Sequence, residues 1–156
     1  MGAGLLPVAK LPESGQYVFL MGLEEDDGLW SDFGGGSQGK ETPLVTALRE
    51  GYEELSGFFG SMTDLRHLVK TRLIEKVVVD TYTTFLFEVP YLAELPFYFA
   101  NNHAFIKKQL PFIVGKNGLF EKKAVRWFTA AELLKEQKKF RPFYRAVLQQ
   151  ILALPV

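Results

Sequence analysis

The sequence predicts a single α/β domain over residues 1–156, in which helices cover both faces of a mixed β-sheet. Three observations lead to this fold class. The chain has 156 residues, of which 47% are apolar, and this is enough for one hydrophobic core. Strand and helix patterns follow one another as strands, a helix, strands and then helices. The links between the strand patterns are short, and no repeat or domain linker interrupts them, which indicates one mixed sheet.

Strands are expected where aromatic and β-branched residues gather between turn residues. Two of them form an antiparallel pair that turns at Asp80. The glycine run at residues 34–36 is expected to be irregular, because no regular element favours three consecutive glycines. The predicted strands span residues 3–8, 16–23, 72–79, 82–89 and 124–128.

Helices are expected where capping residues precede a helical apolar pattern. Thr42 and Pro43 form a favourable helix start, as N-cap and first helical residue, and Gly57 is a natural left-handed cap. This helix should therefore cover residues 43–55. Further helices are predicted over residues 129–137, capped by Thr129, and 142–152; residues 61–69 are a short helical turn, and residues 95–109 are helical or irregular.

The composition excludes several classes of protein. There is no cysteine, so disulfides, thiolate catalysis and cysteine-based zinc sites are excluded. No apolar run approaches the roughly 20 residues of a membrane-spanning helix, and the first residues lack the basic stretch of a secretory signal. We therefore expect a cytoplasmic protein without a membrane partner.

The charges are unevenly distributed along a chain of zero net charge. Residues 1–99 contain 15 acidic and 7 basic residues, whereas residues 100–156 contain 3 acidic and 11 basic residues. Two interpretations stay open: the charges belong to solvated helix faces, or a basic wall holds a polyanion beside an acidic metal site.

The helix at residues 43–55 carries the strongest chemical signal. At about 100° per residue, its apolar residues fall on one face, and Glu50, Glu53 and Glu54 fall together on the opposite face. Such a patch is often only solvated surface. Here, however, the carboxylates repel one another and lie in the last turns, where the helix dipole disfavours negative charge. A divalent cation such as Mg²⁺ would remove both costs, because it prefers oxygen ligands.

Two neighbouring features support this interpretation. Gly35 lies just upstream of the helix, where a backbone without a side chain can approach a metal or phosphate closely. Arg49 is placed to pair with Glu41 and so to fix the loop to the helix. Gly51 costs about 1 kcal/mol relative to alanine within a helix, so it indicates close packing of this helix on the sheet.

The spacing of these residues resembles the Nudix box, whose pattern is G-x5-E-x7-R-E-U-x-E-E-x-G-U, where U is a bulky apolar residue. Six of its seven charged or glycine positions match in register, and Ser56 stands in place of the last glycine, with Gly57 following as if the cap had shifted by one position. The matching residues are Gly35, Glu41, Arg49, Glu50, Glu53 and Glu54.

The resemblance implies a Nudix-type α/β/α sandwich and a hydrolase that splits a diphosphate linkage by attack of water on phosphorus. By similarity, Glu50, Glu53 and Glu54 bind Mg²⁺ or Mn²⁺ with the carbonyl of Gly35. Glu41 and Arg49 orient the site in the same way. The general base stays open between Glu54, Glu53 and Glu121, the last of which is otherwise an ordinary loop acid.

The substrate is less well defined by the sequence. We expect a nucleoside diphosphate derivative or a similar phosphate-rich small molecule, held by basic and aromatic side chains; the aromatic ones would alternatively belong to the core. An RNA 5′ end or a diphosphoinositol polyphosphate, a non-catalytic nucleotide-binding module and a homodimer stay open, and neither His67 nor His103 is expected to be catalytic. The candidate substrate-binding residues are Lys122, Lys123, Arg126, Trp30 and Phe33.

Overall fold

The computed structural model describes residues 1–155. It contains a mixed seven-stranded sheet, which agrees with the predicted fold class. The strands are β1 (Gly2–Lys10), β2 (Tyr17–Glu24), β3 (Trp30–Ser31), β4 (Phe33–Gly36), β5 (Leu73–Val79), β6 (Tyr82–Glu88) and β7 (Lys122–Thr129).

Strand β1 lies at the centre of the sheet and is shared by three partners. One edge pairs in parallel with β6, which in turn pairs with β5 in the expected antiparallel hairpin. The other edge pairs with β2 near Val8 and Ala9, and with β4 near Ala3 and Leu5. Strand β2 therefore diverges from β1 and continues along β7, and β3 and β4 fill the fork between them.

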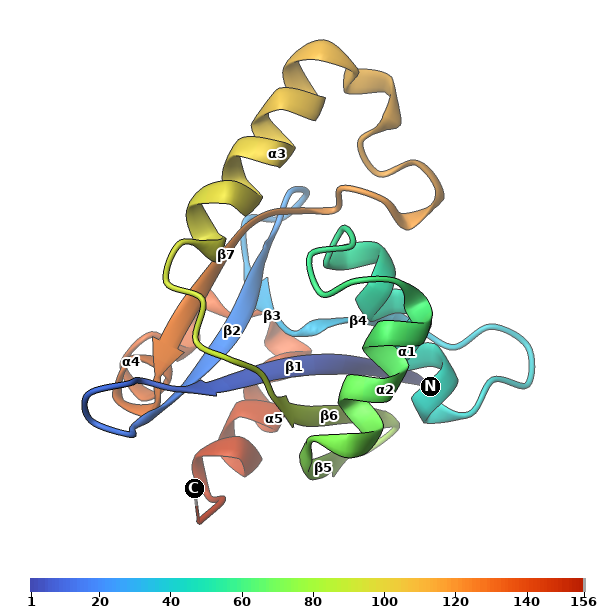
Figure 1. Cartoon of the computed structure of the whole chain (residues 1–156). Helices are drawn as coiled ribbons and strands as arrows, with labels where there is room; N and C mark the ends of the chain where they lie inside the picture. Colours follow the sequence, from blue (N-terminus) through green and yellow to red (C-terminus); the bar gives the residue numbers. More distant parts are fainter. Residues whose placement is uncertain (156) are drawn as a thin grey trace.

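Helices cover both faces of this sheet, as the α/β/α sandwich requires (Figure 1). The helices are α1 (Pro43–Glu54), α2 (Met62–Thr71), α3 (Leu95–Gln109), α4 (Ala130–Lys135) and α5 (Pro142–Leu152). Because side chains alternate along a strand, Leu5 and Leu20 face one core with α1 and α2, and Leu6 and Met21 face the other core with α4 and α5.

Helix α1 forms where the sequence predicts it. The hydroxyl of Thr42 accepts a hydrogen bond from the Val45 amide at 3.3 Å, and Pro43 occupies the first turn. A methyl group added at Gly51 would lie 2.5 Å from Cδ1 of the fully buried Leu5. The missing side chain thus lets the helix lie directly on β1, and this confirms the close packing expected from Gly51.

The end of α1 explains the departure from the box at Ser56. Ser56 and Gly57 both have positive φ, at 53° and 75°. The serine therefore adopts the left-handed conformation that glycine would adopt more cheaply, at a cost of about 1–2 kcal/mol. The chain reverses over two residues, and the three glutamates of α1 keep their positions.

Three local expectations differ from the structure. The glycine run is not irregular but forms the regular strand β4, which pairs closely with β1. A side chain at Gly34 would lie 2.5 Å from the Ala3 carbonyl oxygen on β1, so this close pairing requires glycine. The segment near residue 61 is a full helix, since Ser61 and Asp64 form a reciprocal capping box. Helix α4 is shorter than predicted and ends at Lys135.

Helix α3 departs most from the compact sandwich. Figure 1 shows it projecting from the body, with the following loop returning to β7. Its residues Leu95, Phe99 and His103 are buried, whereas Phe97 and Phe105 are exposed. None of the helices within residues 1–155 is both long enough and apolar enough to cross a membrane.

Candidate active site

A cavity of about 630 Å³ opens between the second half of α1, strand β4 and the loop that precedes β7. The glycines of β4, Arg49 and Arg141 also line it. Five carboxylates face the same space, and three of them come from α1, as the helical spacing predicts. The five are Glu24, Glu50, Glu53, Glu54 and Glu121.

Three of these carboxylates converge most closely. Glu24, Glu54 and Glu121 each place one oxygen atom within 4.8 Å of the other two. Glu54 is only 3% exposed, and its Oε1 has no hydrogen-bond partner among the described residues. Burying a carboxylate oxygen without a hydrogen-bond donor costs free energy. Carboxylate oxygens grouped in this way are suitable ligands for a divalent cation. The donor set therefore fits Mg²⁺ or Mn²⁺.

The electrostatics of the cluster favour binding of a positive charge. Burial raises the pKa of Glu54 well above its usual value, and the Lys122 ammonium opposes this only in part. Burial and the charge of Glu24 also raise the pKa of Glu121. Desolvation and the charge of Glu50 raise the pKa of Glu53. Three acids in one cavity thus hold protons more tightly than free carboxyl groups do.

Arg49 and Glu41 form the pair that the sequence predicts. The Arg49 guanidinium donates to both Glu41 oxygens at 2.8 and 2.9 Å, to Glu50 Oε1 at 2.9 Å and to the Gly36 carbonyl at 3.0 Å. Arg49 holds the pKa of Glu41 at about 2 by these hydrogen bonds. The side chain therefore connects the loop before α1, strand β4 and one carboxylate of the cavity.

Gly35 lies directly beneath the carboxylate of Glu50. A methyl group added at Gly35 would lie 2.6 Å from Glu50 Cδ. At the next residue, Gly36, the nearest atom to such a methyl would be 4.0 Å away. Neither glycine has a positive φ, so the requirement for glycine at position 35 arises from contact with Glu50 and not from the backbone.

We expect Gly35→Ala to lower turnover by about 10–100-fold, in line with other changes that displace a ligand's support. The added methyl would push the Glu50 carboxylate out of the cavity, so the metal concentration for half-maximal activity should also rise. Gly36→Ala is the matched control and should retain activity. Equal losses in both variants, measured by metal titration of turnover, would contradict this role for Gly35.

Glu24 is a candidate site residue that the sequence did not indicate. Glu24 is the last residue of β2 and follows a register shift between Leu23 and Glu24. It is also the first residue of an acidic turn, whose sequence is typical of a solvent-exposed segment. The shift turns its side chain to Lys122, whose Nζ lies 3.0 Å from Glu24 Oε2. No local spacing links Glu24 to α1, so only the tertiary structure brings it to Glu54.

Lys122 has a different place from the one predicted. It is 1% exposed, and its ammonium donates to Ser31 Oγ at 2.8 Å beside Glu24. It therefore neutralises the carboxylate cluster from within the protein and does not present its charge to the cavity. The prediction that Lys122 holds a substrate phosphate is corrected by this burial.

The other predicted substrate residues are scattered. Arg126 pairs with Glu132 and Glu136 at 2.7 Å and stacks on Phe128, on the face of the sheet opposite α1. Trp30 packs edge-on against Phe128, and Phe33 is 0% exposed in the core, so stacking of Phe33 on a base is wrong. Lys123 is half-buried, with its charge near Glu25.

A buried carboxylate lies inside the strand fork, between the end of β3 and the start of β4. Asp32 accepts hydrogen bonds from Tyr82 Oη at 2.7 Å and from Thr84 Oγ1 at 2.9 Å. Burial raises the pKa of Asp32 to about 6 despite these bonds and the nearby Lys122 charge. The strand fork thus contains a carboxyl group that titrates near neutral pH.

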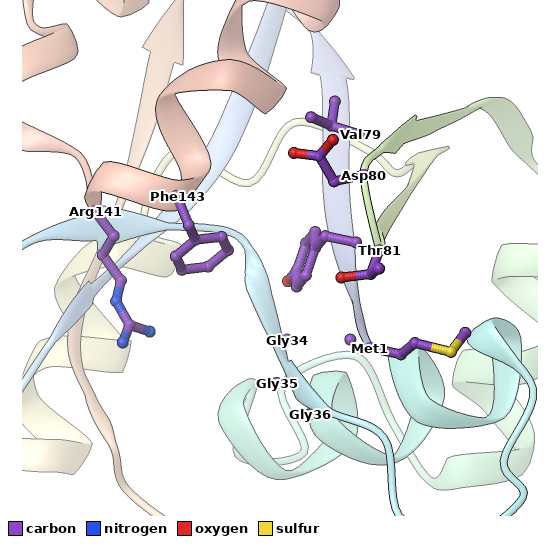
Figure 2. A pocket seen from close by; sticks show the side chains of 11 residues that line it. Met1, Gly34, Gly35, Gly36, Val79, Asp80, Thr81, Arg141 and Phe143 are labelled. Carbon is purple, nitrogen blue, oxygen red and sulfur yellow. The ribbon is translucent and has the colours of Figure 1, made fainter.

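A second cavity of about 430 Å³ adjoins the first and shares Arg141 and the glycines of β4. Figure 2 shows Arg141 and Phe143, from the start of α5, across from Val79, Asp80 and Thr81 at the β5–β6 turn. The Phe143 ring is about half exposed and lies 5.2 Å from the Tyr82 ring, with the Arg141 guanidinium 5.3 Å away. This pocket therefore offers aromatic surface next to the carboxylates.

Comparison with solved structures identifies the fold. The chain is similar to the Nudix hydrolase RenU from M. smegmatis, with a TM-score of 0.58 at 16% identity over 96% of this chain and 82% of that one. It is equally similar to a C. elegans Ap4A hydrolase, with a TM-score of 0.58 at 16% identity over 98% and 96% of the two chains. The chain has the Nudix fold. No protein-family model matches the sequence, and no curated protein does.

One further neighbour is a complex with a nucleotide and a metal ion. It is a bifunctional NMN adenylyltransferase/ADP ribose pyrophosphatase from Francisella tularensis, complexed with AMP and a Mn ion. The TM-score is 0.57 at 12% identity, and the match covers 96% of this chain and 40% of that one. At these identities the likeness shows the fold alone.

Proposed function

We propose that the protein is a hydrolase that splits a diphosphate linkage with the help of Mg²⁺ or Mn²⁺. The observation that carries this proposal is the convergence of Glu24, Glu54 and Glu121 in one cavity with Glu50 and Glu53. A surface patch would not bury a carboxylate as deeply as Glu54 without a donor for its oxygen. The Nudix fold of the chain supports this proposal.

The residues of the carboxylate cavity have separate proposed roles, which follow from where each one lies. Glu54, Glu24, Glu53 and Glu50 would hold the cation, with the Gly35 carbonyl beside them. Such a cation, when bound, neutralises phosphate charge and makes a coordinated water more acidic. Arg49 orients Glu50 through its bond to Oε1.

Glu121 is the candidate general base that the geometry favours. It is less buried than Glu54, lies on the loop just before β7, and has a raised pKa caused by burial and by Glu24. A raised pKa suits a group that takes a proton from water near neutral pH. Glu53 and Glu54 stay as alternatives, since both face the same space.

For the substrate we propose a nucleoside diphosphate derivative. The cavity beside the carboxylates offers the exposed Phe143 ring for a base or another flat group, and Arg141 lies between the two cavities. A diphosphate placed on the carboxylate side could therefore extend into an aromatic pocket. Neighbours with the same fold are described as an Ap4A hydrolase and an ADP ribose pyrophosphatase, and the Nudix domain of Shewanella oneidensis NrtR as complexed with ADP ribose.

We expect turnover of at least one diphosphate substrate that depends on added metal. The panel would hold nucleoside triphosphates, ADP-ribose, dinucleoside polyphosphates, diphosphoinositol phosphates and capped RNA, each with Mg²⁺, Mn²⁺ or a chelator. Release of phosphate or nucleotide is measured. Activity should fall to background with the chelator and return when the metal is restored.

The same panel separates the alternatives. Preference for capped RNA or for diphosphoinositol phosphates would replace the small nucleotide as substrate and keep the reaction. Binding of a nucleotide without turnover by any panel member, from folded protein, would favour a non-catalytic module. A homodimer is likewise a proposal, which light scattering at several concentrations would test.

A further inference from the structure

The loop that delivers Glu121 to the cavity starts from the projecting helix α3. Helix α3 ends at Gln109, and residues 110–121 lead back to β7 through two single turns of 3-10 helix. Near its end, Gly118 lies against the Glu53 carboxylate, so the loop closes one side of the cavity. The position of Glu121 therefore depends on what holds this loop.

His103 connects α3 to the residue just before Glu121. Its side chain is 4% exposed, and Nε2 lies 3.1 Å from the Phe120 carbonyl oxygen and 3.4 Å from Glu25 Oε2. The Phe120 carbonyl oxygen can only accept a hydrogen bond, so Nε2 carries the proton and is the donor.

A second contact holds Glu121 from the other side. The Glu25 amide donates to the Glu121 carbonyl oxygen at 2.7 Å, and the Glu25 carboxylate is bound by Lys107 of α3. The backbone of residues 120 and 121 is therefore fixed at successive carbonyls, first by His103 and then by Glu25. Both fixing groups are tied to α3.

The conformation of Phe120 indicates that this clamp is needed. Phe120 has φ of 59°, a left-handed conformation that costs a residue with a bulky side chain about 1–2 kcal/mol. Such a conformation persists only when surrounding contacts impose it. The hydrogen bond from His103 to the Phe120 carbonyl is a contact of this kind.

We propose that His103 is a positioning residue, which holds the Phe120 carbonyl and thereby keeps the Glu121 carboxylate within reach of Glu24 and Glu54. His103 is not one of the described residues that line the carboxylate cavity. It therefore acts through the loop and does not contact the substrate. The functional part of this inference rests on the proposed hydrolase activity. The structural part, the clamp on the loop, does not.

The activity test compares His103→Phe, which keeps a ring without a donor, with His103→Gln, whose amide can donate to the same carbonyl. His103→Phe should lower kcat about 10–100-fold with little change in KM, because it displaces a general base, and such groups contribute roughly 10²–10⁴-fold. His103→Gln should restore most of kcat. Asn101→Ala, at an exposed position of α3, is the control and should behave as the natural sequence.

A double-mutant cycle shows whether His103 acts through Glu121. In a Glu121→Gln background, His103→Phe should cause little further loss of kcat, because the carboxylate that it positions is gone. Full additivity of the two losses, or failure of His103→Gln to restore kcat while His103→Phe lowers it, would overturn the proposal.

Two further readouts do not need turnover. In the metal-free protein, His103→Phe should speed amide hydrogen exchange at residues 118–121 at least about tenfold, while exchange in α1 stays unchanged. Titration with Mn²⁺ should show unchanged binding in the same variant, because Glu121 acts as the base and lies outside the proposed ligand set. Unchanged exchange would refute the clamp even if the protein hydrolyses no panel member, and weakened Mn²⁺ binding would contradict the role of Glu121 as base. If His103→Phe does not fold, His103→Asn, which is too short to reach the carbonyl, takes its place.

Discussion

Glu54→Gln is expected to abolish turnover and, at the same time, to stabilise the metal-free protein. Glutamine keeps the size of the side chain but removes the negative charge from the centre of the cavity. The loss of a central metal carboxylate should lower kcat at least about a thousandfold, which corresponds to about 4 kcal/mol of activation free energy. The melting temperature should rise, because burial raises the pKa of Glu54 well above normal and its ionised form is costly.

The opposite directions of these two effects distinguish a functional carboxylate from a structural one. If Glu54 served only the fold, its substitution would destabilise the protein, and the melting temperature and the turnover would fall together. Calorimetry without metal, beside a kinetic assay with Mg²⁺, measures both. Glu13→Gln, at an exposed position, is the control and should change neither. Retained turnover in the Glu54 variant would remove the basis of the proposed metal site.

Asp32→Asn is expected to change the pH dependence of stability by about 3 kcal/mol between pH 4 and pH 7. The pKa of Asp32 is raised from 3.8 to about 6, because the group is buried between β3 and β4. Each pKa unit corresponds to about 1.4 kcal/mol. Between these two values the folded protein retains a proton that the unfolded chain has lost.

The direction of the effect follows from proton linkage. The contribution of Asp32 is fully favourable below pH 4 and is lost as the pH rises through about 6, where the buried carboxyl ionises. Asparagine stays neutral, so the variant should gain stability relative to the natural sequence as the pH rises. Urea unfolding at pH 4, 5, 6 and 7 measures the difference, and Asp26→Asn at an exposed position is the control. A difference that is constant across this range would show that Asp32 is already ionised.

The sequence predicted the part of the site that lies on one helix. Glu50, Glu53 and Glu54 are separated by three and four residues, so helix geometry alone places them on one side of α1, and all three line the cavity. The pair between Arg49 and Glu41 followed in the same way, because the helix and its preceding loop are contiguous. Local spacing is sufficient wherever one element contains the whole arrangement.

The rest depends on contacts between distant segments. Glu24 reaches Glu54 only because β2 diverges from β1 and shifts register at its end, and neither feature has a signature in a single sequence. Lys122 and Phe33 look like exposed binding residues in the sequence, but they fill the space inside the strand fork. The regular strand formed by the glycine run follows from its close approach to β1, which the sequence alone does not reveal.

The parallel pairing of β1 with β6 also determines when the protein can assemble. Gly2 pairs with Tyr82, so about 80 residues must be in place before the central strand acquires a partner on its second edge. Helix α1 and its glutamates are synthesised earlier, when only part of the sheet is present for the helix to pack against. Folding should therefore be slow for a chain of this size, limited by closure of that long loop, and the carboxylates should converge only after the sheet has closed.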